Sequence, residues 1–162
     1  MVLAFLWMTG LGYGPALTAV SVTATGFLWA DRRPGLILPW WGSFLGAEAI
    51  TWTIKFVVAR HRPPFIAAAS AVSSAFRSAH ATGALLVYGF LAYALIRGRG
   101  ERPVRFEITF WTAVLIAAVG FSRIFLSLHY ASDVLAGFLV GGCWLLVGTA
   151  VSERRRGAQS GV

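Results

Sequence analysis

The sequence predicts an all-α protein built from membrane-spanning helices, and three observations support that fold class. Of its 162 residues, 57% are hydrophobic and only 12% are charged, whereas soluble domains carry about 25% charged residues. The apolar residues gather in stretches about as long as the roughly 20 residues that cross a bilayer. Short clusters of basic residues separate these stretches, as in proteins that cross a membrane several times.

Five apolar stretches follow one another along the chain, and each predicts about one crossing. They are Leu3–Ala30, Leu36–Val58, Ala79–Ile96, Phe106–Phe125 and Val134–Val151. We expect one membrane-embedded domain over residues 1–151, with no internal repeat. A basic cytoplasmic tail over residues 152–162 follows, and its end is expected to be disordered.

Two groups of residues inside these stretches predict how the helices pack and where they meet the membrane surface. Gly137, Gly141 and Gly142 lie within the last stretch, and small residues at such spacings favour close helix packing. Trp40 and Trp41 lie near the start of the second stretch, where an aromatic belt is expected at the interface.

The basic residues indicate orientation rather than a nucleic-acid partner, although the net charge is +8. Nine of the fourteen cations fall on one side of the predicted bundle: Arg32, Arg33, Arg97, Arg99, Arg102, Arg105, Arg154, Arg155 and Arg156. That side is expected to be cytoplasmic by the positive-inside bias. We therefore expect an integral protein of a bacterial inner (plasma) membrane, with the bilayer as its partner and no nucleic acid.

Polar residues recur at the ends of apolar stretches on the other, non-cytoplasmic side. Lys55 and Arg62 are seven residues apart and share one helical face, and Pro63 ends the helix there. A guanidinium held at a helix exit can bind two phosphate oxygens. The alternative is a pair of side chains that snorkel to the interface. Glu48 lies seven residues before Lys55, and we expect it to have a structural role.

A second polar block begins the third apolar stretch. Ser78 precedes Ala79 in an N-cap position, so the free N–H groups of Ala79 and His80 would point toward an anion. His80 adds a group that can carry a proton to the same place. The alternative is a plain capping serine beside a surface histidine.

The third block, Arg123, His129 and Asp133, is the most specific. His129 and Asp133 are four residues apart and so are neighbours on one helical face. A carboxylate there can fix the imidazole tautomer and leave the other ring nitrogen free to attack. The alternative is a buried pair with a purely structural role.

Together the blocks predict phosphoryl transfer. The residues expected to bind the phosphate are Lys55, Arg62, Ser78, Ala79 and Arg123. The catalytic residues are His129 as nucleophile, His80 as general acid and Asp133 as the partner of His129. Three fixed cations would take the place of a metal ion, and the sequence shows no zinc or magnesium spacing, so no metal or cofactor is expected.

These blocks, in this order, resemble the signature of the type-2 phosphatidic acid phosphatase family of integral membrane lipid phosphatases. The superfamily also contains acid phosphatases and vanadium-dependent haloperoxidases. The first block, Lys55–Pro63, and the third, Ser122–Asp133, fit the family pattern. The second departs from it, because Arg77-Ser78-Ala79-His80 stands where the family usually has Pro-Ser-Gly-His.

The resemblance implies a bundle of about five spanning helices that lacks the family's usual first helix. It also implies metal-independent hydrolysis of a lipid phosphate monoester or diphosphate through a phosphohistidine. The substrate class would be phosphatidic acid, phosphatidylglycerol phosphate or polyprenyl diphosphate. Two alternatives stay open: a lipid phosphotransferase using the same site, and a non-catalytic anionic-lipid-binding protein silenced by the altered second block. The oligomeric state stays open as well.

Overall fold

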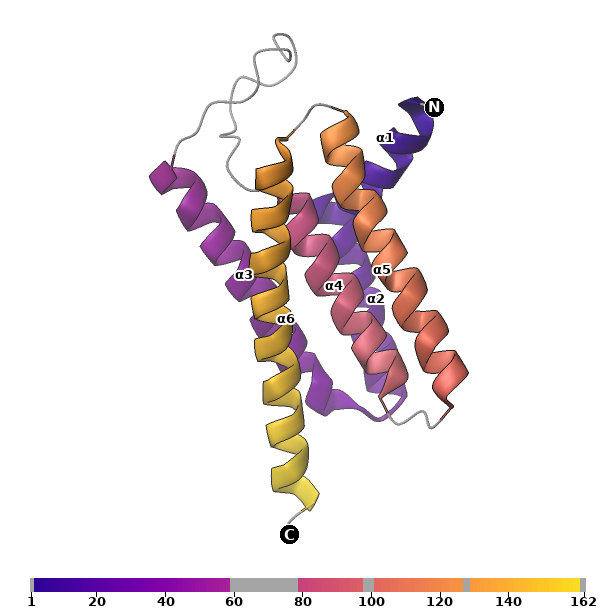
Figure 1. The fold of residues 1–162 in the computed structure, drawn as a ribbon. Helices are drawn as coiled ribbons and strands as arrows, with labels where there is room; N and C mark the ends of the chain where they lie inside the picture. The colour runs from indigo at the N-terminus through magenta and orange to yellow at the C-terminus, as the bar shows by residue number, and fades with distance from the viewer. Residues whose placement is uncertain (1, 59–78, 98–100, 127–128, 161–162) are drawn as a thin grey trace.

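The computed structural model describes residues 2–58, 79–97, 101–126 and 129–160, and these residues form a helical bundle without strands (Figure 1). The helices are α1 (Val2–Leu11), α2 (Gly14–Ala30), α3 (Ile37–Val58), α4 (Ala79–Ile96), α5 (Arg102–Phe125) and α6 (Ala131–Ser160), with a 3-10 turn at Pro34–Leu36. Within the described residues, three helical segments are long and apolar enough to cross a membrane: Ala79–Ile96, Arg102–Phe125 and Ala131–Ala158. The predicted all-α fold class is confirmed.

The first predicted stretch, Leu3–Ala30, is divided into two helices and does not form a single one. Tyr13 adopts an extended conformation (φ −72°, ψ 139°) between α1 and α2. Pro15 explains the break, because it has no N–H to donate to the Leu11 carbonyl four residues before it, and its ring would clash with that carbonyl in a continuous helix. The Tyr88 hydroxyl on α4 donates a hydrogen bond of 2.8 Å to the Leu11 carbonyl, which compensates one acceptor at the end of α1.

The other helix boundaries follow the sequence more closely. α4 begins at Ala79 as predicted, and α5 begins at Arg102, about one turn before the expected Phe106. α6 continues to Ser160, so the expected disorder at the end of the tail is wrong for residues 152–160. Glutamate and arginine are good helix formers, which lets the apolar helix extend into this polar segment.

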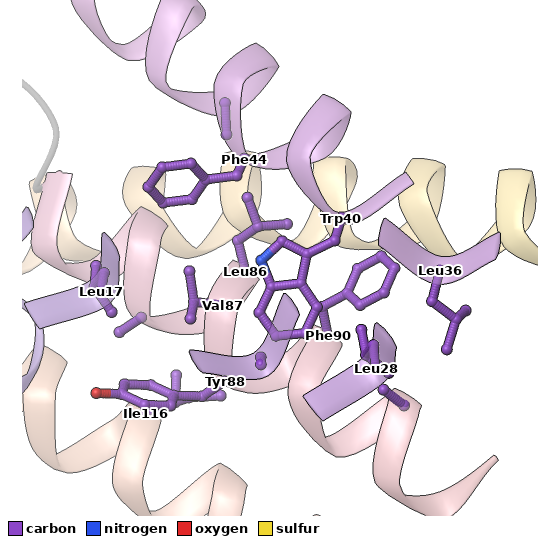
Figure 2. Close-up of a cluster of buried hydrophobic side chains, with 14 of the residues drawn as sticks. Leu17, Leu28, Leu36, Trp40, Phe44, Leu86, Val87, Tyr88, Phe90 and Ile116 are labelled. Carbon is purple, nitrogen blue, oxygen red and sulfur yellow. The ribbon is translucent and has the colours of Figure 1, made fainter. Parts of the chain in front are cut away.

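The hydrophobic core is organised around α4, most of whose side chains are buried (Figure 2). Trp40 of α3 is only 2% exposed, and its ring lies 5.1 Å from that of Phe90 on α4. The predicted place of Trp40 in an interfacial belt is therefore wrong. Trp41 is half-buried and donates its indole N–H to the Thr25 hydroxyl at 2.9 Å, which joins α3 to α2.

Close packing between α4 and α6 depends on glycine. A Cβ atom at Gly141 would lie 2.6 Å from the Thr82 carbonyl oxygen, and one at Gly89 would lie 2.7 Å from Leu145. At Gly142 the nearest side-chain atom, from Leu85, would be at an ordinary 3.6 Å. Gly141 is thus a packing position, as expected. This contact holds the first turns of α4 and α6 at the same end of the bundle (Figure 1).

Candidate active site

Of the residues predicted for the site, those that the structure describes lie near the end of α3 or α5 or near the start of α4 or α6. These helix ends are all in the upper half of Figure 1. Lys55 is in the last turn of α3, and Ala79 and His80 are the first two residues of α4. Arg62 and Ser78 lie outside the described residues. The described part of the site therefore consists of the start of α4 and the connection from α5 to α6.

His129 and Asp133 are brought together at the start of α6. The imidazole Nδ1 lies 3.9 Å from the Asp133 Oδ2, and the two residues are only 8% and 1% exposed. The same Oδ2 accepts a hydrogen bond of 3.1 Å from the N–H of Tyr130, the residue before α6. An acid in the first turn that caps this N–H also meets the positive end of the helix dipole. The carboxylate is therefore fixed in place beside the imidazole.

This geometry suits His129 as a nucleophile. A separation of 3.9 Å is longer than a hydrogen bond, so Asp133 acts on the ring through its charge. A negative charge beside Nδ1 favours the tautomer with its proton on that nitrogen, which leaves the lone pair on Nε2. The same charge would stabilise the positive charge on the ring if Nε2 acted as a nucleophile.

Arg123 links α1, α5 and the connection that carries His129. Its side chain is only 8% exposed, and Nη1 donates a hydrogen bond of 2.7 Å to the Thr9 hydroxyl on α1. Its carbonyl oxygen accepts the N–H of His129 at 3.3 Å. One residue thus holds the backbone of His129 and presents a guanidinium fixed by α1. Sequence analysis did not indicate Thr9, because a lone threonine in an apolar stretch carries no signal.

The break between α1 and α2 packs against His80. A Cβ atom at Gly12 would lie 2.6 Å from Val119 on α5 and 3.2 Å from the Cβ of His80. Glycine is required here, because any side chain would push the break away from both helices. The ring of Tyr13 lies 6.2 Å from the imidazole of His80, centroid to centroid. The break therefore forms a wall beside the predicted general acid.

A cavity of about 310 Å³ adjoins Ala79 and His80 between α2 and α3. Its other lining residues are mostly apolar: Gly12, Tyr13, Gly14, Pro15, Leu17, Thr18, Phe44, Glu48 and Trp52. Largely apolar walls with a few polar groups are typical of small-molecule sites. Glu48, for which a structural role was expected, lies in this wall. The wall residues from α2 carried no sequence signal for a binding site.

The comparisons with known proteins agree with this fold and with the motifs. A sequence model of the PAP2 superfamily matches residues 36–156, which is most of the chain. The chain belongs to the PAP2 superfamily. The matched region includes every residue predicted for the site, whereas Thr9 and Gly12 precede it. The resemblance stated from the three sequence blocks is therefore confirmed, and this PAP2 protein is an integral membrane member of a phosphatase family.

This PAP2 chain is similar to a named relative and to two solved structures. It is 34% identical over 89 residues to phosphatidylglycerophosphatase B of Bacillus subtilis (strain 168), a match that covers 54% of the chain and 44% of that relative. The match thus spans less than half of the relative's length. The crystal structure of a transmembrane PAP2-type phosphatidylglycerolphosphate phosphatase from Bacillus subtilis has a TM-score of 0.85 at 24% identity, covering 94% of this chain and 77% of that one.

A second solved structure, Aquifex aeolicus LpxE, has a TM-score of 0.69 at 18% identity. The match covers 94% of this chain and 85% of that one. At these identities the two crystal structures establish the shared fold of the PAP2 bundle and nothing finer.

Proposed function

We propose that this PAP2 protein hydrolyses a lipid phosphate monoester or diphosphate through a phosphohistidine on His129, without a metal ion. The substrate class is phosphatidic acid, phosphatidylglycerol phosphate or polyprenyl diphosphate. The buried pair of His129 and Asp133 carries the proposal, because its carboxylate is fixed by the Tyr130 N–H beside the nucleophile. A relative named phosphatidylglycerophosphatase B supports the lipid substrate.

In the first step, Nε2 of His129 attacks phosphorus, and the bond from phosphorus to the lipid oxygen breaks. His80, in its protonated form, donates its proton to that oxygen, so the lipid of a monoester leaves with a neutral hydroxyl group. Arg123, with Lys55 and Arg62, stabilises the charge on the other phosphate oxygens during transfer. Because these three charges are permanent at neutral pH, they can supply the stabilisation that a metal ion gives elsewhere.

In the second step, water attacks phosphorus, and the bond from phosphorus to Nε2 breaks. His80, now neutral, accepts the proton of that water, and inorganic phosphate is released. Asp133 stabilises the charged ring of His129 in both steps. The two histidines thus return to their starting protonation states after each turnover.

The cavity beside His80 supports the proposal that the substrate enters from the bilayer. Its walls come from α2 and α3 and are mostly apolar, so they suit an acyl or prenyl chain. The phosphate would then reach the helix ends at His80. We place this end of the bundle on the non-cytoplasmic side of a bacterial inner membrane, because most arginines lie at the opposite end.

The experiment is a phosphate-release assay on the purified protein with a panel of lipid phosphates in the presence of a metal chelator. We expect release to be abolished by His129→Ala and reduced about 10²- to 10⁴-fold by His80→Ala, the range for general acid–base catalysis. His61→Ala is the matched control, since His61 has no proposed role. Turnover of the His129→Ala variant at the wild-type rate would exclude the proposed nucleophile.

A label on the transferred phosphate distinguishes the proposed phosphohistidine pathway from the two alternative functions, a phosphotransferase and a binding protein. An alkaline quench of the wild-type protein should retain an acid-labile phosphoprotein that His129→Ala lacks. Mass spectrometry of the products would instead reveal a phosphotransferase if the label reached an acceptor other than water. Binding of lipid phosphate without release, restored to turnover by Ala79→Gly, would indicate a binding protein silenced by its second block.

A further inference from the structure

The larger of the two cavities described lies at the end of the bundle opposite the candidate active site. It has a volume of about 520 Å³ and lies among the α2–α3 connection, the end of α4 and the last turns of α6. Five arginines line it: Arg32, Arg33, Arg97, Arg155 and Arg156. We call this space the arginine cavity. The proposed phosphatase chemistry makes no use of it.

The backbone at Arg32 indicates that its side chain has a role. α2 ends in a Schellman motif, in which the Arg33 N–H donates to the Leu28 carbonyl at 2.8 Å and the Arg32 N–H donates to the Trp29 carbonyl at 3.2 Å. This motif puts Arg32 in the left-handed region, at φ 56°, the one non-glycine residue with positive φ in the described part of the chain. Glycine fits this position without strain. An arginine here therefore strains the turn and places a guanidinium at the cavity.

Two of the five arginines that line the cavity form ion pairs with carboxylates. Arg33 pairs with Asp31 at 3.0 Å, and Arg97 pairs with Glu153 at 3.5 Å. Tyr93 also donates its hydroxyl proton to Glu153. The five guanidiniums carry five positive charges, and these two carboxylates carry two negative charges. The arginine cavity therefore has an excess of three positive charges.

We propose that the arginine cavity binds the phosphate of an anionic phospholipid headgroup from the leaflet opposite the candidate active site. One guanidinium group can donate two parallel hydrogen bonds to two oxygens of a phosphate, a geometry that an ammonium group does not provide. The cavity begins where α4 ends its apolar span at Ile96, and the exposed rings of Trp29 and Phe106 mark apolar surface on α2 and α5. Basic pockets between helices at the cytoplasmic surface are suited to anionic headgroups. A membrane lipid is thus a better fit than a soluble phosphate.

The test measures thermal stability and lipid binding of the whole protein in neutral detergent, titrated with phosphatidylglycerol or with phosphatidylcholine. We expect phosphatidylglycerol to raise the melting temperature of the wild type and phosphatidylcholine to leave it unchanged. Arg32→Gly should keep or raise the melting temperature without lipid, since it relieves the left-handed arginine. The same variant should bind phosphatidylglycerol about tenfold more weakly, which is the size expected for loss of one charge-assisted contact.

Two further variants make the result specific to the cavity. Arg155→Gln with Arg156→Gln should weaken binding at least as much as Arg32→Gly. Arg154→Gln is the matched control, since it removes the same charge from the same turn of α6 without lining the cavity. Equal losses in Arg154→Gln and Arg32→Gly, or equal stabilisation by phosphatidylcholine, would overturn the proposal. Stabilisation by inorganic phosphate alone, to the same extent as phosphatidylglycerol, would overturn the assignment to a lipid.

Discussion

The two ends of the bundle both present arginine, but they hold it in different ways. At the candidate active site, Arg123 is 8% exposed and donates to a neutral hydroxyl, that of Thr9. At the arginine cavity, Arg33 and Arg97 pair with carboxylates whose side chains are 43% and 52% exposed. A charge in a water-poor site acts more strongly on its neighbours than one that water screens. The first end thus suits the proposed chemistry on one group, and the second suits the proposed binding by several arginines.

This difference determines how each end should respond to substitution. In a buried site each group has a fixed position, so the loss of one group is not made up by another. In a solvated cluster several charges contribute to binding together, so the loss of one is partly offset by the others. A single exposed ion pair contributes about 0–1 kcal/mol to stability. Large effects on turnover should therefore be confined to the end that carries His129.

The largest effect after the loss of His129 is expected for Asp133→Asn. Asparagine retains an oxygen that can accept the Tyr130 N–H, so the start of α6 should persist while the charge beside His129 is lost. We expect kcat to fall about 10⁴-fold, by analogy with the orienting aspartate of hydrolytic triads. The measurement is lipid phosphate release under saturating substrate, with far-ultraviolet circular dichroism to verify the helices.

A control for this substitution exists on α5. Glu107 accepts the indole N–H of Trp111 at 2.9 Å, four residues on, and both side chains are exposed. Glu107→Gln removes a carboxylate from a similar local pair far from His129, and activity should stay within about twofold of wild type. A loss of less than tenfold for a folded Asp133→Asn variant would mean that the charge does not assist His129.

A smaller effect is expected for Thr9→Val, which tests how the buried arginine is held. Valine keeps the shape of threonine but removes the oxygen that accepts from Arg123. A hydrogen bond to a charged group contributes about 1.5–3 kcal/mol, so kcat/KM should fall at least about tenfold. Thr9→Ser should recover most of the activity, because it restores the hydroxyl.

The matched control for Thr9 is Thr23→Val on α2. The Thr23 hydroxyl donates to the Ala19 carbonyl of its own helix at 2.9 Å and lies on an exposed surface. Its removal should leave kcat/KM unchanged. If Thr9→Val matched Thr23→Val in the same assay, the Thr9 contact would have no part in positioning Arg123.

Sequence reasoning found the parts of the site that are local along the chain. A spacing of four predicts that His129 and Asp133 are neighbours on one helical face. They are neighbours, but His129 lies before α6 and not within the helix, so the helical face was wrong. The polar block before Ala79 predicts the start of α4 there. The contact between Thr9 and Arg123 spans 114 positions, and no local pattern encodes such a distance. The interpretation of Leu3–Ala30 as one stretch followed hydropathy alone, although Gly12, Gly14 and Pro15 are recognised break signals.

Trp40 shows why the core was harder to predict than the fold class. In a membrane helix, the faces toward lipid and toward the protein are both apolar, so periodicity does not reveal which face is buried. Trp40 was therefore assigned to the interface from its position in the chain, whereas it packs on Phe90 inside the bundle. Only the contacts with other helices distinguish a tryptophan at the membrane interface from one that is packed inside the bundle.

The smallest effect on turnover, but a clear one on stability, is expected where α6 meets the first turn of α4. In Gly141→Ala the new methyl would meet the Thr82 carbonyl oxygen at 2.6 Å. A backbone oxygen cannot rotate away as a side chain can, so the helices must separate. Overpacking of this kind costs about 1–3 kcal/mol, and at about 2–4 °C per kcal/mol for a chain of this size we expect the melting temperature to fall by about 2–12 °C.

Gly142→Ala is the neighbouring control, because its methyl would find only Leu85 at 3.6 Å. Alanine also favours helix over glycine by roughly 0.5–1 kcal/mol, so this variant should be as stable as wild type or more so. Thermal melts of both proteins in the same detergent make the comparison, with activity assayed well below either melting temperature. Since α6 runs from Asp133 to the arginines of the cavity, a looser α4–α6 contact should also weaken phosphatidylglycerol binding in Gly141→Ala. Equal melting temperatures for the two variants would show that the close approach at Gly141 does not hold the two ends together.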